Sequence, residues 1–378
     1  MSRSVNLPIL PVEIMDMIVL WTNNGSVAHS LRDRISQYVL DRIEKNILIY
    51  GEVQGGKTRA IIEYIRENAS RKKVLVVQNS LLVLKQYEQR LISECIGYQV
   101  ITANTERITE DLVIILNNKY RYNYFSKFEM NNYILMLDES DQTINACPLK
   151  LSKSVKKIVH ITATPYNRMT YDRCIMVPRV ANYYSVEDLA VSLTYTDDNT
   201  ETVENFLKSN TGIMLINRYS YIGQMQNCAV TLALTFPQIP VVLLTSDKKI
   251  YLNNGVKILR CKSISKIIDN LRDYKHIIFI ANRLSNRGLS YVSSDYKRHL
   301  TCQITRIRSN VTSFFQSLRI LGIYNSKSLF NLELVIPDHE QKLFEKHLRF
   351  FKSFDIKEKL NNNLKVTSKK IELKNIKT

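Results

Sequence analysis

Residues 51–58 of this chain, Gly-Glu-Val-Gln-Gly-Gly-Lys-Thr, form a phosphate-binding loop motif in the setting that such a loop requires. The preceding residues 46–50 are apolar and typical of a strand, and residues 59–65 carry apolar side chains at helical spacing. A strand, a glycine-rich turn and a helix start let successive backbone N–H groups surround a phosphate. The motif therefore predicts an α/β fold with a nucleoside triphosphate site.

Within this loop, two side chains have the chemistry to hold ATP and Mg²⁺. Lys57 would reach the β- and γ-phosphates, and the hydroxyl of Thr58 would bind Mg²⁺. The other loop positions expected to contact the nucleotide are Gly51, Gln54, Gly55 and Gly56. A glycine turn with a purely structural role is the alternative, and the flanking strand and helix patterns weigh against it.

The first half of the chain alternates apolar runs with helical patterns, which is typical of a parallel sheet between helix layers. The predicted strands are 46–50, 73–77, 99–102, 112–116, 133–137 and 158–162, with a helix over 80–93. Residues 183–205, polar and acidic at 197–201, are expected to connect two domains. A second set of apolar runs follows at 213–216, 230–234, 241–244, 256–259 and 277–280, again suggesting strands alternating with helices.

The chain of 378 residues is long enough for two such domains. We expect an N-terminal segment, a nucleotide-binding domain, a second α/β domain and a basic, solvated tail, with the respective bounds 1–30, 31–195, 196–350 and 351–378. The tail carries charge that could contact nucleic acid or only confer solubility.

Lys and Arg outnumber Asp and Glu by 53 to 35, giving a formal net charge of +18 at pH 7. A field of this sign favours a polyanionic partner, most simply nucleic acid, over an anionic membrane surface. The alternative source of this charge is an AT-rich genome, since Asn, Ile, Lys and Tyr are abundant.

The six cysteines lie far apart without a CxxC pair, which argues against a zinc module or disulfide framework. No signal peptide or membrane span is visible in the sequence. We therefore expect a soluble intracellular protein, in cytoplasm or nucleus, without a membrane partner.

Acidic and hydroxyl side chains follow two of the predicted strands. Asp138 and Glu139 come at the end of strand 133–137, where ligands bind in open parallel sheets. Asp138 is placed to hold Mg²⁺ and Glu139 to orient and deprotonate an attacking water. Thr162 and Thr164 follow the next strand and could couple the Mg²⁺ site to a moving partner domain. An acidic turn without catalytic function is the alternative for the first pair.

This order of motifs resembles the first motor domain of superfamily 2 helicases and translocases. Residues 281–290 resemble that superfamily's fifth motif, which contacts nucleic acid and ATP. Residues 316–322 resemble its sixth motif, in which an arginine from the second domain reaches the γ-phosphate. The resemblance implies two tandem RecA-like domains, each a mainly parallel sheet flanked by helices, with a cleft between them.

The sixth motif departs from the usual spacing and is more like the Gln-x-x-Arg-x-x-Gly variant of Z1-type domains and some large-DNA-virus helicase-like proteins. Arg319 is the first choice for the catalytic arginine, with an ion pair on a helix face as its alternative role. Arg306, Arg308 and Arg287 are the other candidates.

The resemblance also implies which residues would contact the nucleotide and which would contact nucleic acid. Gln37 would contact adenine, and Gly288 and Gln316 would lie against the nucleotide. The residues that would contact nucleic acid are Gln78, Asn79, Ser80, Thr162, Thr164, Asn282, Arg283 and Ser285. Asn79 or Ser80 could instead serve as a helix cap.

Aromatic residues outside these motifs are more ambiguous. Residues 119–125 interleave bases with rings, which could stack on unpaired nucleotides or form a half-buried connector. Trp21, Phe314 and Phe315 are expected in the core rather than at a ligand.

The predicted function is that of an ATP-dependent nucleic-acid helicase or translocase, whose two-domain motor couples hydrolysis to movement along, or unwinding of, DNA or RNA. The bound polymer would include single-stranded segments, and protein partners from a replication, repair or transcription assembly are compatible with this reading. Two alternatives are an ATPase subunit of a nuclease or transcription-termination complex and a degenerate motor that serves as a nucleic-acid-binding scaffold. The short motor and AT-rich composition resemble helicase-like proteins of large DNA viruses, which would add an infected host cell or a virion to the expected locations.

Overall fold

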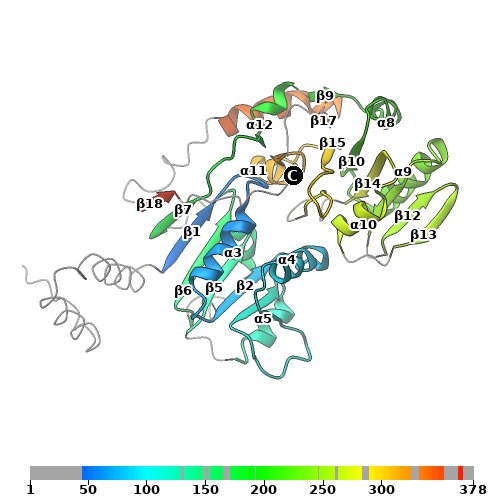
Figure 1. Cartoon of the computed structure of the whole chain (residues 1–378). Coiled ribbons are helices and arrows are strands. Elements are labelled where there is room, and N and C mark those ends of the chain that lie inside the picture. The colour runs from blue at the N-terminus through cyan, green and yellow to red at the C-terminus, as the bar shows by residue number, and fades with distance from the viewer. Residues whose placement is uncertain are drawn as a thin grey trace, which may run out of the picture. The chain divides into compact units, whose positions relative to one another are not determined.

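The structure is a computed structural model that describes residues 45–128, 132–147, 151, 154–164, 171–191, 193–245, 247–259, 263–282, 289–324, 332–352 and 365–368. Predictions for residues 1–30, Gln37, Arg283, Ser285, Arg287 and Gly288 lie outside these ranges, as does that for Trp21. The described residues form two large sheets with helices packed on them (Figure 1).

The first sheet is parallel throughout and contains the phosphate-loop strand in its interior. Its order is β18-β7-β1-β6-β5-β2-β4-β3. The strands are β1 (Asn46–Tyr50), β2 (Lys73–Val77), β3 (Gln99–Val100), β4 (Leu112–Leu116), β5 (Ile134–Asp138), β6 (Lys157–Thr162), β7 (Arg173–Met176) and β18 (Lys365–Ser368). The strands predicted at 46–50, 73–77 and 112–116 are confirmed, and the strand predicted at 133–137 is shifted by one residue so that it includes Asp138.

Helices cover both faces of this sheet, which explains why its central strands are apolar on both sides. Every residue of β2, β4 and β5 is buried. Helices α3 (Lys57–Glu67) and α4 (Leu81–Ser93) pack with alternate strand residues in one buried cluster. Helix α5 (Lys119–Phe125) packs with the other alternate residues in a second cluster.

The second sheet has the order β13-β12-β11-β14-β10-β15-β17-β9. Its strands are β9 (Leu193–Tyr195), β10 (Gly212–Ile216), β11 (Val241–Leu244), β12 (Lys249–Leu252), β13 (Gly255–Ile258), β14 (His276–Ala281), β15 (Leu300–Ile304) and β17 (Glu333–Ile336). Helix α6 (Ser140–Ala146) lies between β5 and β6 of the first sheet. The remaining helices are α8 (Asn199–Leu207), α9 (Ile222–Thr235), α10 (Ile264–Asn270), α11 (Val311–Ser317) and α12 (Gln341–Lys352), with 3₁₀ turns η1 (Asp188–Val191) and η4 (Asp338–Glu340). Phe314 and Phe315 of α11 are fully buried, as predicted.

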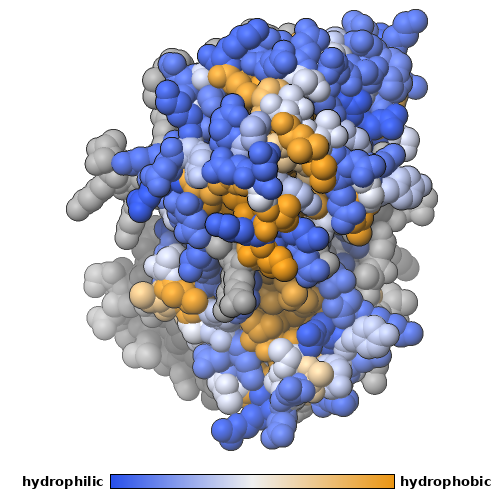
Figure 2. All heavy atoms as spheres, turned by 90° about the vertical axis from the view of Figure 1, so that its right-hand side faces the viewer, coloured by the Kyte–Doolittle hydropathy of each residue, from blue (hydrophilic) through white to orange (hydrophobic). Residues whose placement is uncertain are grey.

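Two apolar runs of the second half do not form buried parallel strands. Residues 230–234 lie within α9, whose buried Met225, Ala229 and Leu232 recur at helical spacing. Strand β13 closes an antiparallel hairpin with β12 at the sheet edge, and all four of its residues are exposed. Asn253 and Asn254, both at positive φ, form the two-residue turn, a geometry that favours asparagine. Figure 2 shows the side of the molecule that faces right in Figure 1, where apolar side chains gather in a band on the surface.

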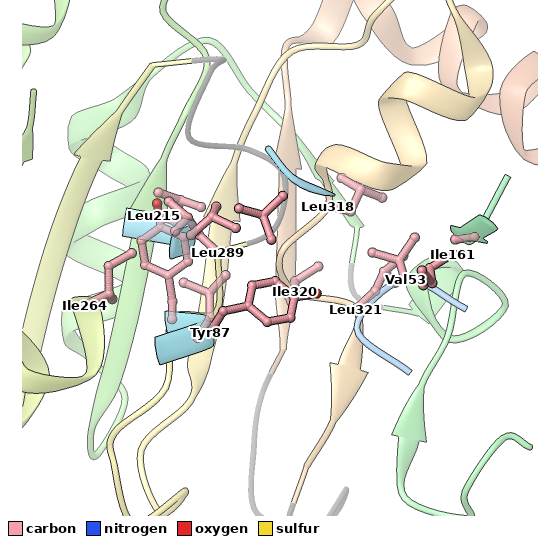
Figure 3. Packing of buried hydrophobic residues seen from close by; sticks show 14 of the residues in the cluster. Val53, Tyr87, Ile161, Leu215, Ile264, Leu289, Leu318, Ile320 and Leu321 are labelled. Carbon is pink, nitrogen blue, oxygen red and sulfur yellow. The ribbon is translucent and has the colours of Figure 1, made fainter. Parts of the chain in front are cut away.

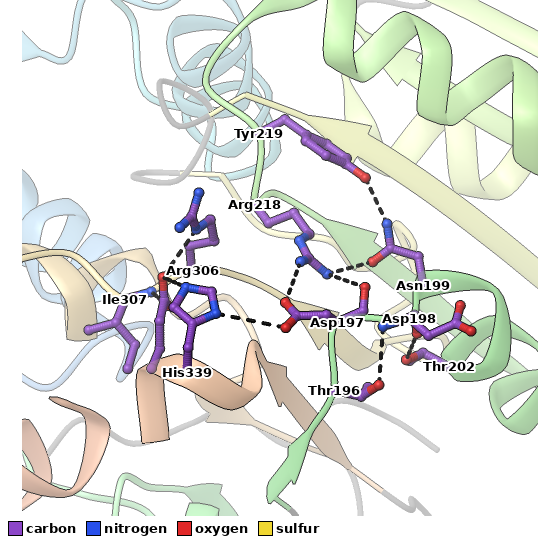
Figure 4. Close-up of polar contacts among 11 residues, drawn as sticks. Thr196, Asp197, Asp198, Asn199, Thr202, Arg218, Tyr219, Arg306, Ile307 and His339 are labelled. Carbon is purple, nitrogen blue, oxygen red and sulfur yellow. Dashed lines mark hydrogen bonds and ion pairs between the residues drawn. The ribbon is translucent and has the colours of Figure 1, made fainter. Parts of the chain in front are cut away.

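The acidic stretch 197–201, which was expected to lie in the connection between the two domains, contains the N-terminus of helix α8. The Asp198 carboxylate accepts hydrogen bonds from the backbone of Thr200 and Glu201 at 2.7 and 3.2 Å and so caps α8. Asp197 forms an ion pair with Arg218 at 3.2 Å, and Arg218 also donates to Asn199 (Figure 4). The predicted domain boundary leaves β9 in the first domain, whereas β9 pairs with β17 in the second sheet.

Short strands also occur in segments where no strand was predicted. A two-stranded antiparallel sheet joins β8 (Tyr183–Tyr184) to β16 (Gly322–Ile323). Within the predicted solvated tail, β18 pairs with β7 in parallel. No helix in the described ranges is long and apolar enough to span a membrane.

Candidate nucleotide site

The loop of residues 51–56 follows β1 and adopts the backbone conformation of a phosphate cradle. Gly56, with φ of 95°, immediately precedes α3 in the left-handed region, which glycine occupies at little cost. The amide of Gly55 donates to the carbonyl of Glu52 at 3.0 Å and closes the turn. The loop thus leads directly into the N-terminus of α3, where backbone N–H groups can hold an anion.

Lys57, the first residue of α3, is buried inside its own loop. Its Nζ donates to the carbonyls of Gly51 and Glu52 at 3.3 and 2.9 Å. Burial lowers the pKa of Lys57, while the nearby carboxylates of Glu139 and Asp138 oppose that shift. A phosphate entering the loop would offer this ammonium a charged acceptor in place of two neutral carbonyls.

Asp138 lies at the carboxyl end of β5, two strands from β1 in the sheet. Its side chain is 7% exposed, and Oδ2 accepts a hydrogen bond from the Tyr87 hydroxyl at 2.8 Å. Burial, reinforced by the charge of Glu139, raises the pKa of Asp138 to about 7. A cation at this position would favour the ionised carboxylate.

Glu139 combines an unusual backbone with an unsatisfied side chain. It precedes α6 in the left-handed conformation, with φ of 48°. Its Oε2 atom is buried and has no hydrogen-bond partner among the described residues. Buried acceptors without partners are rare and often occur at functional sites.

Thr162, the last residue of β6, and Thr164 just after it form hydrogen bonds that connect Asp141 of α6 to α11 in the second half of the chain. Thr162 Oγ1 donates to Asp141 at 3.1 Å and accepts from the backbone amide of Thr164 at 3.0 Å. The amide side chain of Gln316 donates to Thr164 Oγ1. A chain of hydrogen bonds therefore runs from the acidic loop to the predicted sixth motif.

The Arg319 side chain donates hydrogen bonds to backbone carbonyls of the second half of the chain. Its guanidinium donates to the carbonyl of Leu289 at 3.3 Å and to that of Gln316. The carbonyl of Arg319 itself accepts from the side chain of Gln54 in the phosphate loop at 2.7 Å. Arg319 is close enough to Lys57 to contribute to its lowered pKa, although burial is the larger cause.

Gln303 on β15 fixes the backbone around Arg319. Its Oε1 accepts from the amides of Arg319 and Ile320 at 2.7 and 3.1 Å. Its Nε2 donates to the Ser317 carbonyl at 3.1 Å and to Asn217 at 3.3 Å. Because this side chain is fully buried, no water replaces these bonds if it is lost.

We predict that Gln303→Leu loosens the arginine segment, since two buried amides lose their acceptor at about 1–3 kcal/mol each. Hydrogen exchange at the amides of Arg319 and Ile320 should accelerate, with a lower melting temperature. Gln303→Glu retains the acceptor and should protect these amides better than the leucine variant does. Equal exchange in wild type and Gln303→Leu would contradict the assigned role.

Several of the residues described above line one cavity of about 570 Å³. Its lining includes Gln54, Gly56, Lys57, Thr58, Asp138, Glu139, Gln316 and Arg319. Val53, Ile161, Ile320 and Leu321 belong to one buried apolar cluster next to it (Figure 3). The structure thus brings residues of the phosphate loop, the acidic pair and the segment predicted as the sixth motif to one cavity.

The described residues that were predicted to contact nucleic acid lie outside the lining of this cavity. Ser80 occupies the N-cap position of α4 without a side-chain cap bond, and exposed Asn79 accepts from Asn118 at 2.9 Å. Gln78 and Asn282 are half-buried at strand ends. Residues 119–125 form α5 rather than a connector, with Tyr122 and Phe125 buried and Tyr120 78% exposed.

Tyr87, Asp141 and Gln303 were not singled out from the sequence as site residues. Tyr87 lies on the apolar face of α4 with Val83, Leu84 and Leu91, so its spacing indicates a core residue. Its hydrogen bond to Asp138 joins residues 51 positions apart and depends on the tertiary structure. Asp141 lies within the acidic motif and could have been found there.

The residues present fit Mg²⁺ and a triphosphate. Hard oxygen ligands, with substrate phosphates and waters completing the shell, are typical of protein Mg²⁺ sites. Asp138 and Thr58 line the cavity together and supply a carboxylate and a hydroxyl. Glu139, whose Oε2 has no hydrogen-bond partner among the described residues, lines the same cavity.

No protein-family model matches the sequence, and a comparison with curated proteins finds no match. Solved structures are similar in fold. S. cerevisiae Dbp5 bound to RNA and ADP BeF3 has a TM-score of 0.54 at 10% identity, over 86% of this chain and 85% of that one. The Escherichia coli DEAH/RHA helicase HrpB has a TM-score of 0.50 at 12% identity, over 82% of this chain and 42% of that one.

This chain therefore spans less than half of HrpB and most of Dbp5. At these identities the similarity concerns the fold. Each large sheet with its helices is similar in fold to a RecA-like domain, and the two together are similar to the paired RecA-like domains of these helicase structures.

Proposed function

We propose that this protein is a nucleic-acid-dependent ATPase that moves along, or unwinds, DNA or RNA. One observation carries the proposal: a single cavity is lined by Lys57, Thr58 and the acidic pair from one domain and by Arg319 from the other. A transition-state arginine supplied by a second domain makes hydrolysis depend on domain closure. That dependence is the physical basis for coupling ATP to movement.

In the proposed mechanism, ATP with Mg²⁺ supplies the reacting phosphate and its counter-charge. The Lys57 ammonium would leave the carbonyls of Gly51 and Glu52 for the phosphates. The Glu139 carboxylate would orient a water and accept its proton, while Arg319 would turn toward the γ-phosphate. Gln37 and Gly288 are proposed as further nucleotide contacts on grounds of resemblance.

Nucleic acid would bind mainly through its phosphates. The charge of +18 supports this, as do Gln78, Asn79 and Ser80 near the start of α4, where backbone donors can hold a phosphate. We assign Thr162, Thr164, Asn282, Arg283 and Ser285 to the same interface from the resemblance. The spacing of Gln316, Arg319 and Gly322 supports a motor of the large-DNA-virus type.

We predict steep salt dependence of strand binding. Release of counterions from only a few neutralised phosphates lowers affinity about tenfold or more between 50 and 200 mM salt. Fluorescence anisotropy with labelled single-stranded DNA and RNA measures this. An affinity unchanged by salt would contradict phosphate-dominated binding.

The function is tested by ATP hydrolysis with and without single-stranded DNA or RNA, using Lys57→Ala as the control. Strong stimulation that vanishes in Lys57→Ala supports a nucleic-acid motor and identifies its polymer. Retained strand binding without turnover in either protein would favour a scaffold or a subunit that awaits its partner.

A further inference from the structure

Residues 177–189, here called the connector, follow β7 and contact the phosphate loop at three points. The Tyr183 hydroxyl donates to the Val53 carbonyl at 2.6 Å. Arg179 Nε donates to the Glu52 carboxylate at 2.8 Å. A Cβ added at Gly51 would lie 2.8 Å from Val177 Cβ, so the connector packs directly on the loop.

The same connector pairs with the arginine segment, residues 316–324. Tyr183 and Tyr184 of β8 lie opposite Ile323 and Gly322 of β16. The amide of Tyr324 donates to the Asn182 carbonyl at 3.1 Å, one residue before β8. The connector is therefore bonded to both protein segments that would surround the nucleotide phosphates.

Tyr183 is the residue that joins the two sets of contacts. Its backbone lies in β8, whereas its buried side chain reaches the loop. Burial, with the charge of Glu52, raises the pKa of Tyr183 well above its usual value, so the phenol stays protonated and donates. In a loop that wraps a phosphate the amides point inward, and an external donor can hold an outward-facing carbonyl.

We propose that Tyr183 is a positioning residue that couples the phosphate loop to the arginine segment. The inference rests on the proposed ATPase function. Nucleotide binding rearranges the loop around Val53, Tyr183 transmits that change to β8, and its partner strand β16 shifts with Arg319. No catalytic contact by Tyr183 is involved.

The neighbouring tyrosine provides a matched control. The Tyr184 hydroxyl donates to the Asp188 carbonyl at 3.3 Å, within the connector. Tyr183→Phe and Tyr184→Phe each remove one oxygen from adjacent residues of the same strand. A difference between them reports the contact of the Tyr183 hydroxyl with the phosphate loop.

The test measures fluorescent ADP affinity, ATPase kinetics and hydrogen exchange in the full chain. Tyr183→Phe should lower kcat about three- to tenfold, as expected for one lost hydrogen bond, with a smaller change in KM. In wild type and Tyr184→Phe, ADP should alter exchange at the amides of Ile323 and Tyr324. In Tyr183→Phe, ADP should still bind without altering that exchange.

The outcomes distinguish failure of the proposed coupling from failure of the proposed ATPase function. Absence of ADP binding by the folded wild type would overturn the proposed function itself. ADP binding without any effect on Ile323 and Tyr324 in wild type would overturn the coupling, and this needs no variant that folds. Equal behaviour of Tyr183→Phe and Tyr184→Phe would likewise overturn it.

Discussion

Glu139→Gln should slow ATP hydrolysis by about 10²–10⁴-fold, the contribution of a positioned general base. Nucleotide affinity should change little, because the amide has nearly the same shape and Glu139 is not proposed to bind the phosphates. The buried, unpartnered Oε2 of Glu139 is the atom that this substitution replaces. Single-turnover hydrolysis and fluorescent nucleotide binding separate the two effects.

Glu63→Gln is the matched control for this substitution. Glu63 also lies in the first domain, but its carboxylate forms an ion pair with Arg59 at 3.1 Å on α3. Its removal should leave hydrolysis within about twofold, since such pairs contribute little. Comparable losses in Glu63→Gln and Glu139→Gln would contradict a catalytic role for Glu139.

Arg319→Ala should lower kcat by about 10³-fold or more, the range for a transition-state arginine. Arg319→Lys keeps the charge but loses the planar fork, and should recover only part of the rate. ATP should still bind, because the phosphate loop remains intact. Steady-state kinetics with a melting-temperature check measures the loss.

Arg306→Ala distinguishes Arg319 from another candidate arginine. Arg306 forms an ion pair with Glu340 at 3.1 Å and its side chain is 45% exposed. Its substitution should change kcat by less than about threefold, because exposed ion pairs are weak. A large loss in Arg306→Ala beside an active Arg319→Ala would transfer the catalytic role to Arg306.

Local patterns were sufficient for the central strands of the first sheet, although β7 and β18 were not predicted. Strands β1, β2 and β4 are buried apolar runs bounded by polar residues, so their limits follow from composition alone. The phosphate loop and acidic pair must meet because β1 and β5 are parallel strands of one sheet. Residues of the phosphate loop, the acidic pair and the predicted sixth motif are among those that line the cavity.

What the sequence could not show depends on contacts between distant segments. Gln303 reads as one polar residue in a strand, but three of its four hydrogen bonds are to residues 317–320 and the fourth is to Asn217, so they exist only when these distant segments fold against it. Tyr183 lies in a segment whose polarity suggested a linker, yet it bonds to Val53. The apolar run 256–259 was noted, but its antiparallel pairing with β12 at an exposed sheet edge was not, because the pairing depends on the turn at Asn253 and Asn254.

The most direct test of the account is the affinity for a labelled single strand without nucleotide, with ADP and with a non-hydrolysable ATP analogue. A motor that couples ATP to movement must bind its strand differently in these states, and linkage requires the strand to change nucleotide affinity reciprocally. We predict at least a fivefold difference between the ADP and ATP-analogue states, the lower end of usual coupling. Identical strand affinity in all three states, with nucleotide demonstrably bound, would contradict the two-domain motor.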